Sequence, residues 1–240
     1  MNRRTITRRD MLALLATTGT MALFPSLGEA APQHQTEEPQ HPAEEASPTV
    51  TPQEALSRLK EGNARFASGK SRHAHESADL RHLLKSGQHP FAIVLGCSDS
   101  RVPVELIFDQ GFGDLFVIRV AGNVITDDVL GSIEYARIHL NSQLLVILGH
   151  EGCGAVTAAL AARNHASSDP HGVQTIVKLI EPAISNVDVS LPVSEQLHRA
   201  VEANVRWAQD ELKKLPETQN LPLHTVGAVY DLEGTVHWLG

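Results

Sequence analysis

The chain contains two cysteines, and a histidine precedes the second of them by three positions. Cys97 follows the apolar run 91–96, and His150 and Cys153 follow another apolar run at 144–149. Two thiolates and one imidazole form a ligand set that Zn²⁺ prefers, and three protein ligands leave a fourth tetrahedral position for water. The pattern predicts that Cys97, His150 and Cys153 bind one zinc ion per chain in a site of the catalytic type.

The two cysteines also allow other interpretations. A disulfide bond between Cys97 and Cys153 would suit an exported protein. Two inert buried thiols are the commonest state of free cysteine. Because only two cysteines are present, a disulfide-rich secreted scaffold is excluded.

An acidic and a basic residue follow Cys97 at alternate positions, Asp99 and Arg101. Alternate side chains of an extended chain share a face. We therefore expect Asp99 close to the metal, with Arg101 holding it through a charge-assisted pair. The alternative is a surface ion pair on a turn, worth about 1 kcal/mol or less.

The elements that must position these residues alternate along the chain. Strands are expected at 91–96, 115–120 and 144–149, with a final strand or hairpin at 226–232 and 235–239, and helices at 51–68, 77–85, 127–140, 155–162, 174–184 and 194–214. This alternation predicts an α/β fold with a central, mostly parallel sheet flanked by helices. Ligands of such sheets bind at the carboxyl ends of the strands, where Cys97 and His150 lie.

The first fifty residues differ in character from the rest. Arg8-Arg9 precedes the apolar stretch 11–24, so residues 1–30 resemble a twin-arginine export signal with a cleavage site before Ala31, although an uncleaved anchor is the alternative. Residues 31–50 are rich in Pro and Glu and are expected to be a disordered linker before a domain at 51–240. We expect the export machinery as a partner and a periplasmic or other extracytoplasmic location.

The composition limits the classes of function. The chain has 240 residues, 42% of them hydrophobic and 20% charged, which excludes wholesale disorder. Its formal net charge is -8, and a nucleic-acid-binding protein normally carries a basic face. No nucleic-acid partner is expected.

Two motifs carry a specific resemblance. The segments CSDSRV at 97–102 and GHEGCG at 149–154 resemble the signature motifs of the β-class carbonic anhydrases, and segments 108–123 and 131–136 fit the same family. The similarity runs from about residue 51 to the C-terminus. It implies a mainly parallel sheet extended by a C-terminal strand, a homodimer or higher oligomer, N-terminal helices whose apolar stripe at 51–68 packs on the partner, and a site at the dimer interface.

The resemblance also implies an activity, the reversible hydration of CO2 to bicarbonate and a proton through a zinc-bound hydroxide. Asp99 and Arg101 are then the catalytic dyad, and the substrate-binding residues are Gln88, Phe116, Ala121, Gly122 and Tyr135. A related hydrolase acting on COS or CS2 could use the same zinc site. A non-catalytic binding protein stabilised by zinc or a disulfide would not need Asp99, Arg101 and Gln88 together.

The resemblance also bears on regulation. Some members of the family are shut when the aspartate binds zinc, assisted by bicarbonate in a pocket that uses a Trp three residues before the first zinc ligand and an Arg on the next strand. Here the basic residue is Arg119, but Val94 stands in the Trp position. Valine has no N–H to donate to an anion. We therefore expect an accessible site near neutral pH, with Asp99 paired to Arg101.

Overall fold

The structure is a computed structural model that describes residues 50–163, 169–214 and 223–239. All of them lie in one compact unit, Glu45–Gly240. The expected export leader and almost all of the expected linker lie outside the described residues, so both stay predictions. Among the described helices, none has the length and apolar character needed to cross a membrane.

The centre of the fold is a five-stranded sheet with the order β2-β1-β3-β4-β5. Four strands are parallel and the last is antiparallel to its neighbour, which confirms the predicted mostly parallel sheet and the final hairpin. The strands are β1 (Ala92–Gly96), β2 (Leu115–Arg119), β3 (Leu144–His150), β4 (His224–Tyr230) and β5 (Val236–Leu239).

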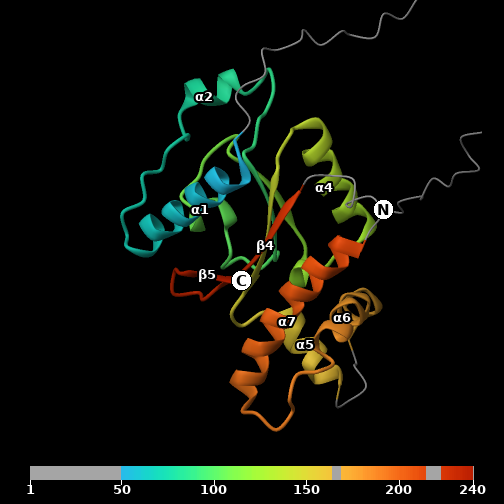
Figure 1. Cartoon of the computed structure of the whole chain (residues 1–240). Helices are drawn as coiled ribbons and strands as arrows, with labels where there is room; N and C mark the ends of the chain where they lie inside the picture. Colours follow the sequence, from blue (N-terminus) through green and yellow to red (C-terminus); the bar gives the residue numbers. More distant parts are fainter. Residues whose placement is uncertain (1–49, 164–168, 215–222, 240) are drawn as a thin grey trace, which may run out of the picture. The chain divides into compact units, whose positions relative to one another are not determined.

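Helices occupy both faces of this sheet (Figure 1). They are α1 (Pro52–Ala67), α2 (Ala78–Leu83), α3 (Val104–Ile107), α4 (Asp127–His139), α5 (Gly154–Ala162), α6 (His171–Ile184) and α7 (Val193–Lys214), with a short 3-10 turn η1 (Ala121–Asn123). The sequence did not predict α3 or η1, since each is a single turn too short to show a helical period. The helix expected from residue 174 begins at His171.

The alternation of side chains along β1 and β3 divides the core into two layers. Ile93 and Leu95 face a layer with α4, α5, α6 and α7, whereas Val94 and Leu148 face a layer with α1 and α3. Both sets are fully buried, which explains why these strands are continuous apolar runs. The carboxyl ends of β1 and β3 are therefore held side by side between two helical layers.

Helix α1 begins with a capping box at Thr51. The Thr51 side chain accepts a hydrogen bond from the Glu54 N–H, and the Glu54 carboxylate accepts one from the Thr51 N–H. The apolar stripe of α1 packs on the sheet of the same chain, where Ala55 and Leu59 are fully buried. Ala55 and Leu59 are therefore not available to a partner subunit, because residues of their own chain cover them. Contact between the rest of this helix and a partner stays a prediction.

Candidate metal centre

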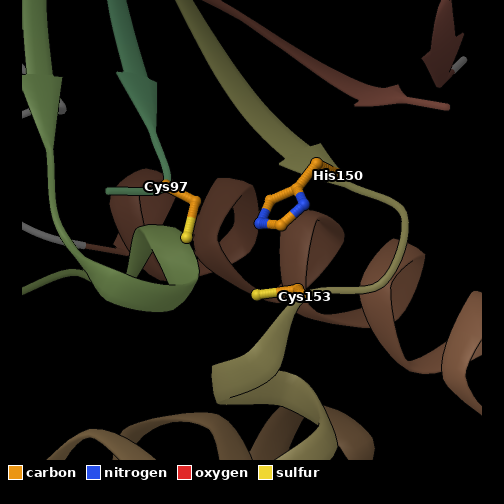
Figure 2. A group of neighbouring side chains, drawn as sticks. All are labelled: Cys97, His150 and Cys153. Carbon is orange, nitrogen blue, oxygen red and sulfur yellow. The ribbon is translucent and has the colours of Figure 1, made fainter. Parts of the chain in front are cut away.

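The three expected metal ligands meet at one edge of the sheet. Cys97 directly follows β1, His150 ends β3, and Cys153 is the residue before α5. The parallel register sets Gly96, the last residue of β1, beside Leu148, so Cys97 lies next to the carboxyl end of β3. The ligand atoms of Cys97, His150 and Cys153, the ligand triad, lie within 4.8 Å of one another, and all three residues are buried. Figure 2 shows both sulfur atoms and one imidazole nitrogen directed toward a common space.

The ring of His150 is oriented for binding a metal. Its Nδ1 lies 2.9 Å from the Glu151 carbonyl oxygen, which can only accept, so Nδ1 carries the hydrogen. Nε2 is then left with a lone pair. Within the described part of the chain this buried atom has no hydrogen-bond partner. A buried, unpartnered acceptor facing two sulfur atoms fits a cation bound by the ligand triad.

The two cysteines are free thiols, so the structure does not support the disulfide interpretation. Hydrogen bonds from the Cys153 thiol and the Gly122 N–H lower the pKa of Cys97 well below its usual range, against the opposing effect of burial. The hydrogen bond with Cys97 and burial raise the pKa of Cys153 well above its usual range. A divalent cation between the sulfurs would supply the positive charge that lets both be thiolates. The donor set therefore fits zinc.

Asp99 and Arg101 form the pair that their alternate positions predict. Arg101 Nε lies 2.9 Å from Asp99 Oδ1, and Nη2 lies 2.8 Å from Oδ2. These hydrogen bonds hold the pKa of Asp99 well below its usual range, although partial burial acts in the opposite direction. Asp99 Oδ2 lies 3.9 Å from His150 Nε2. An ionised carboxylate therefore stands beside the ligand triad.

Two arginine side chains hold the loops that carry the triad. Arg101 Nη2 also donates to the Gly152 carbonyl at 3.2 Å, which links the loop after β1 to the loop after β3. Arg119 on β2 donates from Nε to the Cys97 carbonyl at 3.0 Å and from Nη2 to the Asp99 carbonyl at 2.6 Å. From the sequence, Arg119 was noted only as the basic residue of a bicarbonate pocket. Its hydrogen bonds to the Cys97 and Asp99 carbonyls were not predicted, because the sequence offers no signal for them.

The expected substrate-binding residues fall into two groups. Gly122 lies at the triad, because its N–H donates to Cys97 Sγ at 3.3 Å, and Ala121 precedes it in the chain. Phe116 lies opposite Ile93, near the amino end of β1 and thus away from Cys97.

The other expected substrate-binding residues lie beyond Phe116 or before β1. The Tyr135 ring centroid is 6.2 Å from that of Phe116, and this side of α4 is open, with Tyr135 48% exposed. Gln88 is exposed in the segment before β1. Within one chain, Gln88, Phe116 and Tyr135 do not join the triad, and their roles stay predictions.

Comparison with known proteins identifies one family. The family model described as carbonic anhydrase matches residues 92–236. The protein "Carbonic anhydrase 2" of Mycobacterium tuberculosis is 50% identical over 137 residues, which cover 57% of this chain and 66% of that protein. The carbonic anhydrase of Mycolicibacterium smegmatis is 47% identical over the same length and the same shares. The match thus spans just under two thirds of each mycobacterial protein.

Solved structures extend the similarity to the arrangement of the fold. The β-carbonic anhydrase CcaA superposes with a TM-score of 0.62 at 28% identity, covering 77% of this chain and 95% of that one. The β-carbonic anhydrase CafA of Aspergillus fumigatus gives a TM-score of 0.56 at 32% identity, covering 77% and 88%. These structures share the sheet and helices that bring the ligand triad together here.

Proposed function

The chain belongs to the carbonic anhydrase family and to its β class, and we propose that it catalyses the reversible hydration of CO2 to bicarbonate and a proton. The observation that carries this proposal is the buried ligand triad, in which the unpartnered His150 Nε2 faces two sulfur atoms. One zinc ion per chain, held by Cys97, His150 and Cys153, would lower the pKa of a water molecule toward about 7 and so supply a nucleophile near neutral pH.

Asp99 is the residue that would orient the nucleophile. Its carboxylate is ionised, stands beside the triad and can accept a hydrogen bond from the attacking water or hydroxide. Accepting that hydrogen bond keeps a lone pair of the nucleophile directed at the carbon of CO2. Arg101 donates hydrogen bonds to both Asp99 carboxylate oxygens and to the Gly152 carbonyl. It therefore fixes the carboxylate relative to the loop that bears Cys153.

The structure around Asp99 supports an accessible site. The Asp99 side chain is 19% exposed and the Arg101 side chain 53% exposed, so bicarbonate and the released proton can leave toward solvent. Arg119 is engaged with two backbone carbonyls, and Val94 is fully buried in the sheet. These contacts favour the paired Asp99 and Arg101 arrangement expected from the sequence, with bicarbonate acting only as the product.

We propose further that the protein is a homodimer or a higher oligomer and that the partner supplies part of the substrate pocket. Gln88, Phe116 and Tyr135 lie apart from the triad of their own chain, and β2 is an edge strand with one open side. Tyr135 and Ile138 of α4 are 48% and 58% exposed. Two similar β-carbonic anhydrases, from Sordaria macrospora, are described as tetrameric.

We also propose that the protein is exported. Support comes from the sequence alone, since Arg8-Arg9 precedes a modestly apolar stretch at 11–24, as in twin-arginine signals. That route carries folded proteins, which suits a chain whose two thiols would bind a metal before export.

Zinc content and CO2 hydration together test the proposed activity. The purified full-length chain should contain one zinc per chain and hydrate CO2 in a stopped-flow assay. Removing the metal with a chelator should abolish hydration, and adding zinc should restore it. A protein with no zinc and a Cys97–Cys153 disulfide, or a zinc-loaded protein without hydration, would contradict the proposal.

A further inference from the structure

The backbone at Gly122 contacts the ligand triad. Its N–H donates to Cys97 Sγ at 3.3 Å. The residue has a φ of 69°, in the left-handed region that favours glycine. A Cβ there would lie 2.8 Å from Ile180 Cδ1 and 3.1 Å from Ala155 Cβ. Both the backbone angle and the close packing therefore favour glycine at this position.

Glycine does not by itself hold the orientation that this contact needs. It has the widest range of backbone conformations of any residue, so its peptide groups turn easily unless other groups restrain them. The N–H to sulfur bond restrains Gly122 on its amino side only. Its carbonyl oxygen needs a separate partner for the residue to be fixed from both sides.

That partner is Asn204 on α7. Its side-chain Nδ2 donates to the Gly122 carbonyl oxygen at 2.9 Å, across 82 residues of sequence. Asn204 is only 4% exposed and interrupts the otherwise apolar buried face of α7, whose other buried residues are Ala200, Val201, Val205, Ala208 and Leu212. A buried amide among apolar neighbours is costly unless it is hydrogen-bonded. The contact with Gly122 provides such a bond.

We propose that Asn204 is a positioning residue for the metal centre: by fixing the Gly122 carbonyl, it keeps the Gly122 N–H directed at the Cys97 sulfur. A hydrogen bond to a thiolate withdraws electron density from the sulfur, and contacts of this kind tune a bound metal. The inference rests on the proposed function in one respect, because it takes a zinc-like cation to bind the ligand triad.

The expected consequence is a change in the metal site that simple loss of stability would not produce. Without Asn204, Gly122 can turn its N–H away, and Cys97 becomes a stronger electron donor. In the cobalt-substituted protein the thiolate-to-metal charge-transfer band should then move to longer wavelength. Zinc affinity should fall by about 10- to 100-fold, the usual cost of losing a contact that orients a metal ligand.

The test compares Asn204→Leu and Asn204→Asp with the wild type, all as full-length chains. Both substitutions keep the approximate side-chain size and remove the amide donor. The control is Leu212→Ala, which makes a cavity in the same buried face of α7, eight residues further along the helix, and so lowers stability without removing the hydrogen bond to Gly122. Absorption of the cobalt protein and competition for zinc with a coloured chelator are measured for each.

The proposal predicts a shifted band and weaker zinc binding in the Asn204 variants, with a wild-type band in Leu212→Ala. A wild-type band and wild-type affinity in folded Asn204 variants would overturn it, since Asn204 would then only satisfy a buried carbonyl. If neither variant folds, the wild type loaded with ¹¹³Cd decides. Scalar coupling between the metal and the Gly122 amide proton would show that this N–H points at Cys97 Sγ, as the proposal requires, and its absence overturns the proposal. These readouts do not depend on CO2 hydration, so a cobalt-binding but inactive wild type would refute the proposed function alone.

Discussion

At the scale of single residues, Asp99 is the group on which the proposed chemistry depends most. Replacing it by Asn keeps the size of the side chain but removes the charge and one of the two acceptor oxygens. Asp99→Asn should keep one zinc per chain and lose CO2 hydration by about 100-fold or more, the usual contribution of a carboxylate positioned at the reacting group. Metal analysis and stopped-flow hydration between pH 6 and 9 measure both quantities.

A matched control for this substitution is Asp127→Asn. Asp127 is an exposed acid in the first turn of α4, where it makes no contact with the triad. Its replacement should leave hydration and zinc content unchanged. Full hydration activity in Asp99→Asn across the pH range would show that the carboxylate does not orient the nucleophile.

The functional residues that the sequence predicts differ from those that it does not predict in how their roles arise. Cys97, His150 and Cys153 were recognisable because their types suit zinc and because each comes soon after an apolar run of the sequence. Asn204 was not recognisable, since a buried Asn in an amphipathic helix looks like any polar position until its partner is known.

The contacts of Arg119 with the carbonyls of Cys97 and Asp99 were concealed for the same reason. Backbone carbonyls occur at every position, so the sequence does not show which of them a distant side chain will reach.

At the scale of elements, long apolar runs predicted the buried strands correctly because both faces of β1 and β3 are covered by helices. The short elements η1 and α3 were not predicted, although η1 contains Gly122, whose N–H contacts the triad. Tertiary contacts determine such single turns more than the periodicity of their sequence does.

Asp109, two residues after the end of α3, joins three segments of the fold. Its side chain is 1% exposed and lies 2.5 Å from Arg65 Nε on α1, and it accepts hydrogen bonds from the N–H groups of Arg72 and His73. Burial raises the pKa of Asp109, but the hydrogen bonds from Arg65, Arg72 and His73 outweigh it, so the pKa is lowered overall. This carboxylate therefore stabilises the folded state in its ionised form.

The sign of the pH effect follows from that lowered pKa. The contribution is fully present above the pKa of Asp in the unfolded chain, about 3.9, and is lost as pH falls through the lower folded pKa. Asp109→Asn should lower the free energy of unfolding at pH 7 by about 2–3 kcal/mol. The difference between wild type and variant should shrink below about pH 4, as urea unfolding at several pH values would show.

The control for Asp109 is Asp210→Asn on α7, where a 61% exposed carboxylate pairs with Lys213 on the surface. Exposed pairs of this kind contribute little, so its unfolding curves should match those of the wild type. The contribution of the metal site is common to all three proteins and cancels in the comparison. A difference for Asp109→Asn that stays constant down to pH 2 would show that the ionised form of Asp109 has no stabilising role.

At the scale of the whole molecule, the export signal can be tested by its two arginines. Replacing Arg8 and Arg9 together by Lys keeps the charge but removes the pair that the twin-arginine route reads. The variant should stay in the cytoplasm, whereas the wild type should appear in the periplasmic fraction. A matched change of Arg3 and Arg4 to Lys should leave export intact. Export of the Arg8 and Arg9 variant would favour the general secretory route instead.

The division of the proposed site between two subunits can be tested by complementation. One chain carries Asp99→Asn and its partner carries Gln88→Ala. If Gln88 acts in the site of the other subunit, a mixed dimer contains one site with both changes and one site with neither. Each mixed dimer should then regain about half of the wild-type hydration rate, although both parent dimers are impaired.

The opposite arrangement gives a different result, because each site of the mixed dimer would then carry one of the two changes. Its activity would equal the average of the two parents. Within one chain Gln88 is exposed before β1, whereas Asp99 lies beyond the carboxyl end of the same strand, and this separation favours action across the interface. Purifying mixed dimers with two different affinity tags and measuring CO2 hydration separates the two arrangements. Activity no higher than the parental average would place Gln88 outside the partner's site.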